Sequence, residues 1–241
     1  MKTLVAMDTK SVVGKSLVEE RTGQPCENFR NGDHTTTLIR TENGKVIEIQ
    51  HDVMTPQPYN RLYQLTGTKG FANKYPIEGY ALDAKQLNAS GVAPEVDNLN
   101  SHSFMPKKDM EALVQKYQHP ILKKYGEMAK EVGGHGGMDF IMDSRLVYCL
   151  QNGLPLDMDV YDLAEWCCLA ELGELSMDNN CAAVAFPDFT RGEWNKVKGY
   201  KHAYASPEDE SVAMEKAKKI TAKLKEKGAV EWAGEAVENK K

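Results

Sequence analysis

The N-terminal part of the chain alternates between apolar and polar positions, which is the pattern of a β-strand with one buried face. The strands that this alternation and the β-branched residues predict cover residues 2–8, 34–41, 45–52, 61–68 and 70–75. Asn43-Gly44, between the second and third of these segments, favours a tight hairpin turn. Consecutive strands joined by hairpins favour a mostly antiparallel sheet. Residues 11–22 predict a helix that ends at Gly23.

From residue 107 onward the apolar positions follow a helical period. The predicted helices cover residues 107–118, 121–132, 138–151 and 160–177. The apolar faces expected of the last two helices consist of Met138, Ile141, Met142, Leu146, Cys149 and Leu150, and of Val160, Leu163, Trp166, Cys167 and Ala170. Strands followed by helices predict an α+β fold class, with a mostly antiparallel open sheet and helices packed on one side.

Three segments fall outside this pattern. Residues 83–106 are polar and without a period, which predicts a long loop or insertion, and residues 186–192 (FPDFTRG) predict an extended segment. Residues 206–241 are rich in Lys, Glu and Ala and predict a solvated, charged helical tail. The expected organisation is therefore one α+β domain over residues 1–205, followed by this tail.

Composition narrows the classes of partner. The 241 residues carry 30 Lys and Arg against 35 Asp and Glu, a net charge of −5, which disfavours nucleic acid and anionic membranes. No apolar run approaches the roughly 20 residues that span a bilayer. The first residues form a poor signal peptide, so the compartment stays unknown, and a parent protein with more sequence before Met1 could be exported. Because the alternation begins at the first residues, we expect either a domain that opens inside a strand or a chain whose first part is missing.

The cysteines favour neither a disulfide framework nor a zinc site. There are five of them, an odd number, and no Cys-x-x-Cys pair occurs. Cys149 and Cys167 are expected to be core thiols on helix faces. A metal site would need His34, His51 and His135 to converge through tertiary structure, and we therefore expect no metal.

The most unusual segment is Gly-Gly-His-Gly-Gly at residues 133–137, directly before a predicted helix. Glycine permits positive φ and close approach of another group, and a helix N-terminus presents free N–H groups beside His135. The spacing predicts either a ligand site or a glycine turn between two helices, and it does not separate these two. A dinucleotide fingerprint does not fit, because the position that would need glycine holds Asp139 and no strand precedes the motif.

Two imidazole–carboxylate neighbours occur at strand ends, Asp33-His34 and His51-Asp52. Adjacent residues of a strand point to opposite faces, so neither pair is automatically a catalytic dyad. Hydrogen-bonded or surface strand residues are the simpler interpretation of both pairs.

Tyr59 and Arg61 lie in a proline-rich elbow, Pro56-Gln57-Pro58-Tyr59-Asn60-Arg61. Two prolines fix φ and remove N–H donors, so the backbone here is rigid. A tyrosine held in this way can offer its hydroxyl to a ligand, with the charge of Arg61 beside it. The alternative is a tyrosine that packs on the sheet.

Two further sets of residues have structural interpretations. Asp188 and Arg191 are expected to pair with each other or with a neighbouring segment. Trp166 and Trp194 are expected in the core or at an interface rather than as a platform for a sugar.

Several of these segments, taken in order, resemble one known family. GGHGGMDFIMDSRLVYCLQNGLPLDMDVYDLAEW and FPDFTRGEW, preceded by GDHTTTLIRT, KVIEIQHD, TPQPYNRL and GTKG, are similar to the C-terminal part of glycoside hydrolase family 109. The resemblance covers roughly residues 2–200 and consists of several ordered motifs, so it is specific for the family but less so for the sugar.

The resemblance implies an NAD-dependent α-N-acetylgalactosaminidase on the Gfo/Idh/MocA oxidoreductase plan. In that plan an N-terminal Rossmann domain binds NAD, and a C-terminal α+β domain closes the sugar site and often forms an oligomer interface. The implied reaction is redox elimination, in which the sugar is oxidised, the aglycone is expelled, water adds and the hydride returns. By residue, Tyr59 resembles the family's elbow tyrosine, and His135 with its glycines matches the GGHGGMD motif. Both would bind substrate, together with Arg61.

The sequence departs from the family plan in one large respect. No glycine fingerprint and no Tyr-x-x-His motif, which is similar to the family's acid–base pair, occur in these residues. We therefore expect no catalytic and no cofactor-binding residue in this chain, a missing Rossmann domain, and a truncated gene, a fragment or half of a split enzyme.

The expected function is that of a substrate-binding and assembly domain of an NAD-dependent glycosidase, inactive by itself. The alternatives are a non-catalytic carbohydrate-binding or oligomerisation module and part of a sugar oxidoreductase of the same superfamily. The expected partners are a small sugar or glycoside and further copies of the chain, because a sheet without its covering domain exposes an apolar face.

Overall fold

The computed structural model describes residues 1–83, 85, 102–153 and 156–195. They divide into two compact units, and each is described by itself. The described part of the first unit comprises residues 1–56, 143–153 and 156–195, and that of the second comprises residues 57–83, 85 and 102–142. The predicted tail at 206–241 and most of the predicted loop at 83–106 lie outside the described residues.

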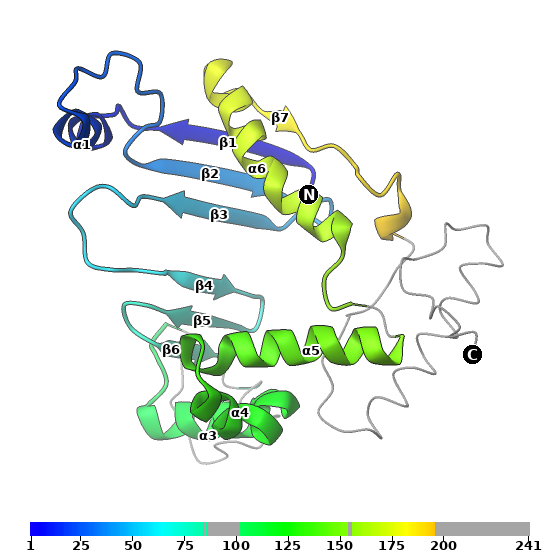
Figure 1. Cartoon of the computed structure of the whole chain (residues 1–241). Helices are drawn as coiled ribbons and strands as arrows, with labels where there is room; N and C mark the ends of the chain where they lie inside the picture. The colour runs from blue at the N-terminus through cyan, green and yellow to red at the C-terminus, as the bar shows by residue number, and fades with distance from the viewer. Residues whose placement is uncertain (84, 86–101, 154–155, 196–241) are drawn as a thin grey trace. The chain divides into compact units, whose positions relative to one another are not determined.

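The first unit contains a four-stranded sheet with the strand order β3-β2-β1-β7 (Figure 1). All its pairings are antiparallel. The strands are β1 (Thr3–Asp8), β2 (Thr35–Arg40), β3 (Val46–His51) and β7 (Val184–Ala185). The register pairs Ile39 with Leu4 on one side and with Ile47 on the other, so these three share one face of the sheet.

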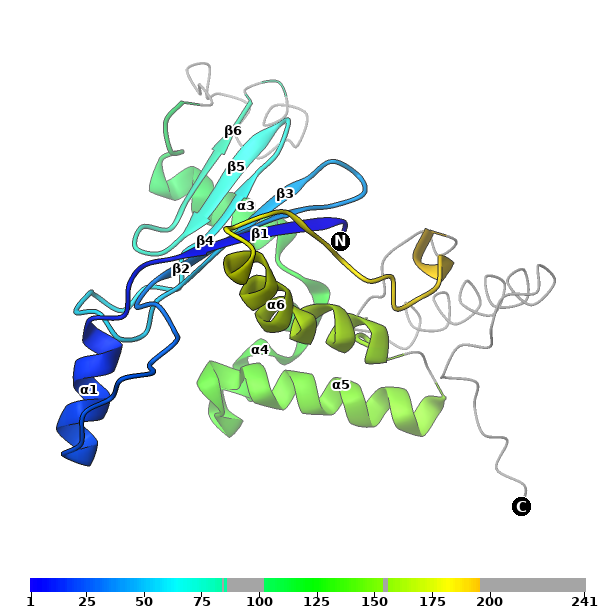
Figure 2. The same cartoon turned by 90° about the horizontal axis from the view of Figure 1, so that it is seen from above.

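Helix α6 (Val160–Asp178) lies across that face (Figures 1 and 2). Leu169 and Leu172 of α6 pack against a buried cluster formed by Leu4, Ala6 and Ile39. The fully buried hydroxyl of Ser176 accepts a hydrogen bond from the Ala6 N–H at 3.0 Å and donates one to the Ala182 carbonyl at 2.7 Å. The core of the first unit is therefore a helix-on-sheet layer.

In this unit, carboxylates accept hydrogen bonds from the free N–H groups at the starts of α1 and α6. Asp159 forms a capping box with Asp162 at the start of α6. At the start of α1 (Val13–Thr22), the carboxylate of Asp33 accepts hydrogen bonds from the N–H groups of Val12, Val13 and Gly14 at 2.8–2.9 Å. These N–H groups would otherwise lack an intrahelical partner.

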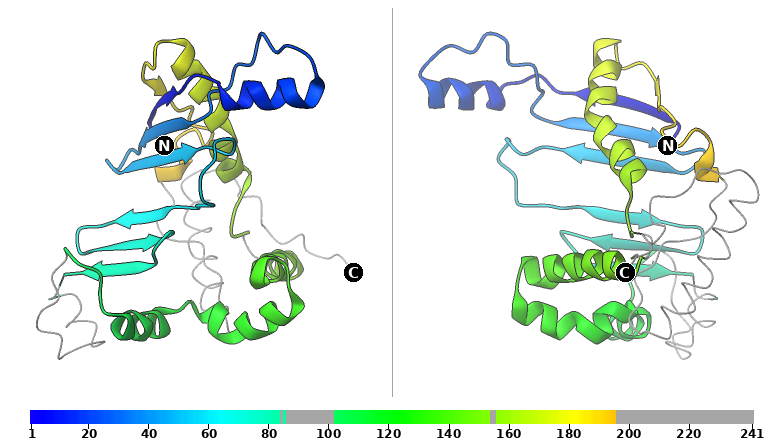
Figure 3. Two further views of the ribbon diagram at one scale, coloured as in Figure 1. Left: turned by 90° about the vertical axis from the view of Figure 1, so that its left-hand side faces the viewer. Right: turned by 45° about the vertical axis from the view of Figure 1, so that its right-hand side comes forward.

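The second unit holds a three-stranded antiparallel sheet, ordered β4-β5-β6. Its elements are β4 (Tyr63–Thr66), β5 (Gly70–Lys74), β6 (Gly79–Leu82), α3 (Lys107–Tyr117), α4 (Pro120–Val132) and the short 3₁₀ helix η1 (His135–Gly137). Met105 is buried among Tyr80 and Leu82 of β6 and Met110 and Leu113 of α3, so α3 lies beside β6 (Figure 3). Helix α5 (Met138–Asn152) begins in this unit and continues into the first.

The predicted α+β class with antiparallel open sheets is confirmed, but the strands form two sheets rather than one. The break falls in the segment between β3 and β4, which contains Pro56 and Pro58. Proline has no N–H to donate and fixes φ, so regular strand pairing does not continue through this segment. Strand β6 was not predicted.

The helices predicted from residue 107 are present, but their buried faces differ from prediction. Cys149 is buried as predicted, whereas Cys167 is exposed. On α6, Leu169, Leu172 and Ser176 face the sheet, and nine residues at about 100° each place Cys167 opposite Ser176. On α5 the expected apolar side chains Met138, Met142, Leu146 and Leu150 are exposed, while Arg145 and Cys149 are buried.

Among the helices in the described part of the chain, none combines the length and the apolar character required to cross a lipid bilayer.

Candidate functional site

The glycine segment forms a tight turn between α4 and α5. Gly133, Gly134, Gly136 and Gly137 all have positive φ, between 72° and 98°. At Gly137 a Cβ atom would meet the backbone carbonyl carbon of Ala129 at 2.6 Å, so no larger residue fits against the end of α4. The turn that the spacing allowed is therefore present, and it sets the position of His135.

His135 is presented to solvent at the tip of this turn. Its φ is +47°, its side chain is 72% exposed, and Nδ1 lies 2.8 Å from Oδ2 of Asp139 in the first turn of α5. With the Nδ1–H donated to that carboxylate, the neutral ring keeps an acceptor lone pair on Nε2. Within the described ranges no protein group bonds to Nε2, so this atom can accept a hydrogen bond from a ligand.

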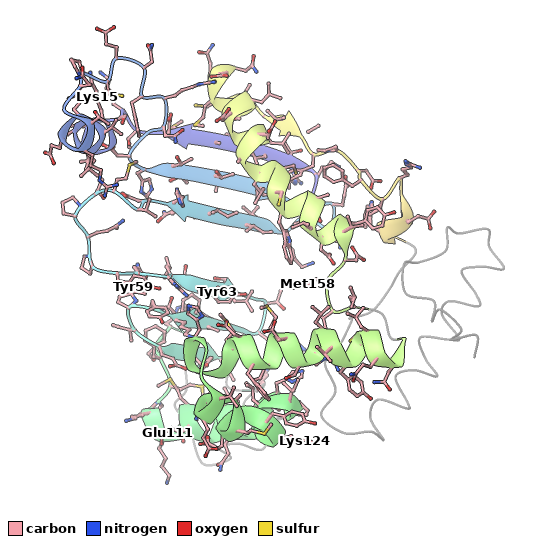
Figure 4. The ribbon with its side chains drawn as sticks, viewed as in Figure 1. Lys15, Tyr59, Tyr63, Glu111, Lys124 and Met158 are labelled. Atoms are coloured by element: carbon pink, nitrogen blue, oxygen red, sulfur yellow. The ribbon has the colours of Figure 1, made fainter. Side chains whose placement is uncertain are left out.

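Tyr59 and Arg61 form a second exposed pair in the segment before β4. The guanidinium carbon of Arg61 lies 5.3 Å from the centroid of the Tyr59 ring, and Tyr59 is 72% exposed. Figure 4 labels Tyr59 in this segment and Tyr63 on β4. Tyr59 therefore does not pack on the sheet, and its hydroxyl is accessible.

Tyr59, Arg61 and His135 belong to the same unit. Across the described residues, no hydrogen bond, ion pair or ring contact joins the Tyr59–Arg61 pair to His135.

A contact across the strands joins one member of Asp33-His34 to one member of His51-Asp52. The register that sets Thr35 opposite His51 places His34 beside Asp52. Nδ1 of His34 lies 3.5 Å from Oδ2 of Asp52, and Nε2 lies 3.2 Å from Oγ1 of Thr36. A two-residue turn at Asn43-Gly44 would have set Thr35 opposite Asp52, whereas residues 42–44 form a three-residue loop closed by Thr41 and Lys45, which brings His34 level with Asp52.

Asp52 is held in its charged form. The Thr55 hydroxyl donates to Oδ2 at 2.6 Å, and the N–H groups of Thr55 and Met54 donate to Oδ1. These hydrogen bonds lower the pKa of Asp52 to about 2, and the bond from the Thr55 hydroxyl has the largest effect. The side chain of Asp52 is 9% exposed, and that of His34 is 35% exposed.

Asp188 stabilises its own turn. Its carboxylate accepts from the Thr190 hydroxyl at 2.7 Å and from the N–H groups of Thr190 and Gly192. These hydrogen bonds lower the pKa of Asp188, and the bond from the Thr190 hydroxyl has the largest effect. In the described part of the chain no ion pair links Asp188 to Arg191. Trp166 and Trp194 are 49% and 46% exposed, so neither lies in the core, and the other expected place, an interface, stays a prediction.

Sequence reasoning missed one partly buried ion pair. Arg145 of α5 is nearly buried, and its Nε and Nη2 each lie 3.1 Å from one oxygen of Asp157. Nη2 also lies 3.5 Å from Sγ of Cys149, whose pKa is raised by burial. The signal was an arginine on an otherwise apolar helix face, four residues before a buried cysteine. This two-point contact ties α5 to the segment that leads into α6.

Among the described residues no group of three or more His, Cys, Asp or Glu side chains is placed to hold a metal ion. His51 is exposed on β3, and His34 and His135 each pair with one aspartate.

Comparison with known proteins defines first the class and then the family. Residues 1–196 match a family model described as the C-terminal domain of glycosyl hydrolase 109. The class is therefore that of glycosyl hydrolase domains. The chain belongs to glycosyl hydrolase family 109.

The relatives agree with this assignment. The chain is 84% identical over 239 residues to glycosyl hydrolase family 109 protein 5 of Phocaeicola vulgatus, a match that covers 99% of this chain and 46% of the relative. Protein 4 of the same organism is 84% identical over 236 residues, covering 98% and 46%. A family 109 protein of Porphyromonas gingivalis is 60% identical over 205 residues, covering 85% and 44%. The chain thus spans about half the length of the curated relatives it matches.

Proposed function

We propose that this chain is the substrate-binding and assembly domain of an NAD-dependent glycosidase that hydrolyses α-N-acetylgalactosaminides by redox elimination. We further propose that it is inactive without a nucleotide-binding domain of the Gfo/Idh/MocA type. The observation that carries the proposal is membership of family 109 over residues 1–196, combined with coverage of about half of each relative. The sugar, the cofactor and the reaction rest on the resemblance of the motifs.

The described residues do not fit NAD. Every strand pair in the described ranges is antiparallel, whereas a dinucleotide site requires parallel strands, a glycine-rich turn and a helix whose N-terminus receives the pyrophosphate. This supports a place for NAD in another domain. No step of the reaction is therefore assigned to residues of this chain.

His135 and Tyr59 supply the sugar contacts in this proposal. Nε2 of His135 can accept a hydrogen bond from a sugar hydroxyl, and Asp139 holds the ring and its tautomer from the Nδ1 side. The Tyr59 hydroxyl can donate or accept, and the charge of Arg61 favours electron-rich groups such as the acetamido carbonyl. These contacts position the sugar.

The test uses this chain alone and a chimera in which it replaces the matched part of the Phocaeicola vulgatus protein 5. We expect that the chain alone releases no aglycone from an aryl α-N-acetylgalactosaminide above a buffer blank, with or without NAD⁺. We expect that the chimera releases it. Turnover by the chain alone would overturn the proposed division of roles. Net NADH formation without release would favour a sugar oxidoreductase, and sugar binding without either would favour a non-catalytic module.

In the chimera, His135→Ala is expected to lower kcat/KM about tenfold or more, because one hydrogen bond to a sugar hydroxyl is lost. The matched control is Glu131→Gln, an exposed residue at the end of α4, which is expected to leave kcat/KM unchanged. Equal activity of the two variants would remove His135 from the proposed sugar site.

A further inference from the structure

Helix α6 is apolar on two opposite sides, and the structure covers one of them. Leu169, Leu172 and Ser176 face the four-stranded sheet. The opposite side, here called the outward face of α6, consists of Val160, Leu163, Trp166, Cys167 and Ala170.

All residues of the outward face are exposed. Val160 is 64% exposed, Leu163 57% and Trp166 49%, and Cys167 and Ala170 are also exposed. Met158, labelled in Figure 4 at the entrance to α6, extends the face with 51% exposure.

The spacing of the outward face is that of a helix–helix contact. Val160, Leu163, Cys167 and Ala170 are separated by three, four and three residues, the interval of the seam between paired helices. Large side chains lie at the start, and the small Cys167 and Ala170 allow a partner helix to approach closely. Beyond the apolar part, the exposed Glu171 and Glu174 give the face an acidic end.

A helix with apolar stripes on two sides normally has both sides packed against other elements. A protein surface packed against the outward face would remove it from water. Leaving this apolar face in water forgoes the stabilisation that its burial would give.

We propose that the outward face of α6 docks an apolar helix, with basic groups at its acidic end, from the part of the family protein that lies outside the region matched by this chain. This inference rests on the proposed function, which requires such a second domain. The occupant is chosen because the matched region is 46% of the Phocaeicola vulgatus relative, so more than half of the same polypeptide is available. A covalent link gives it an effective concentration on the order of millimolar, above that of any separate copy.

Cys167 provides a direct probe, because it lies within the outward face. The experiment compares this chain, at a concentration at which it sediments as a monomer, with the chimera described above. Both are treated with N-ethylmaleimide, and alkylation is followed by mass spectrometry in a Cys168→Ser background. Cys26 and Cys181 serve as half-exposed references, and Cys149 serves as the buried one.

Cys167 is expected to react rapidly in the chain alone and at least tenfold more slowly in the chimera, with Cys26 and Cys181 unchanged. Leu163→Glu in the chimera is expected to restore rapid alkylation. Leu175→Glu, on the same helix and 49% exposed but outside the face, is the matched control and is expected to leave the protection intact.

Equal rates in the chain and the chimera would overturn the proposal, as would a protected Cys167 in the monomeric chain. If Cys167 in the chain alone becomes more protected as the chain concentration rises, the occupant is a second copy, and this result would also overturn the proposal. Aglycone release by the chimera is measured on the same samples. An active chimera with a reactive Cys167 refutes the docking alone, and an inactive chimera with a protected Cys167 refutes the function alone.

Discussion

At the scale of single residues, the clearest feature is how carboxylates are used. Asp33, Asp52, Asp159 and Asp188 each accept several hydrogen bonds from nearby backbone N–H or hydroxyl groups. Such bonds favour the charged form of a carboxylate and lower its pKa, as the structure gives for Asp33, Asp52 and Asp188. These aspartates organise turns and helix starts.

Asp52 predicts a specific dependence of stability on pH. Its folded-state pKa of about 2 lies below the ordinary 3.8, so its contribution is complete above the unfolded pKa and is lost as pH falls towards about 2. Asp52→Asn is expected to lower the urea midpoint at pH 7, and the gap from the wild type should shrink below about pH 5. Asp33 and Asp188 are common to both proteins, so their titration cancels. A gap that stays constant down to pH 2 would contradict this assignment.

At the scale of elements, the connection between α4 and α5 depends on glycine for two distinct reasons. Gly136 and Gly137 both have positive φ, of 72° and 98°. Only Gly137 also lies against backbone, because a Cβ there would meet Ala129, whereas at Gly136 nothing lies within 4 Å. One substitution at each position therefore separates the cost of the backbone conformation from the cost of the contact with Ala129.

Gly137→Ala is expected to destabilise the chain by about 2 kcal/mol or more, because the end of α4 has to shift. Gly136→Ala, the matched control, is expected to cost about 1 kcal/mol, the strain of a left-handed alanine. Denaturant unfolding followed by circular dichroism measures both. Equal losses would show that the close approach to Ala129 contributes nothing.

At the scale of the whole molecule, the four-stranded sheet has a second face that α6 does not cover. The register places Leu38 beside Val5 on this face. Met7 is 61% exposed, Leu38 46% and Val46 67%. Exposed apolar side chains on such a face favour association between copies of a protein. We therefore propose that the expected homo-oligomers form through this face.

Leu38→Glu is therefore expected to weaken self-association at least tenfold, because a charge in an apolar contact has to be desolvated. The wild type is expected to sediment as a dimer or larger species at micromolar concentration. Leu65→Glu in β4, 66% exposed, is the control and is expected to behave as the wild type. A wild-type chain that sediments as a monodisperse monomer would refute the prediction.

Much of this protein could be predicted from local sequence. The alternation in residues 2–52 predicts β1, β2 and β3, and Asn43-Gly44 predicts the antiparallel pairing of β2 with β3. The helical period from residue 107 fixes α3 to α6, and the ordered motifs identify the family. Hydrophobic periodicity and turn residues depend on only a few neighbouring positions, so they can be interpreted without knowing the rest of the structure.

Only the tertiary structure decided which groups meet. It paired His34 with Asp52, separated β3 from β4, paired Arg145 with Asp157 and turned Cys167 outward. The sequence of α6, with two apolar sides, indicates only that either side can be buried. Which side meets the sheet is determined by Leu4, Ala6 and Ile39, more than a hundred residues away. Contacts of that kind depend on the positions of whole elements, and no pattern along the sequence contains them.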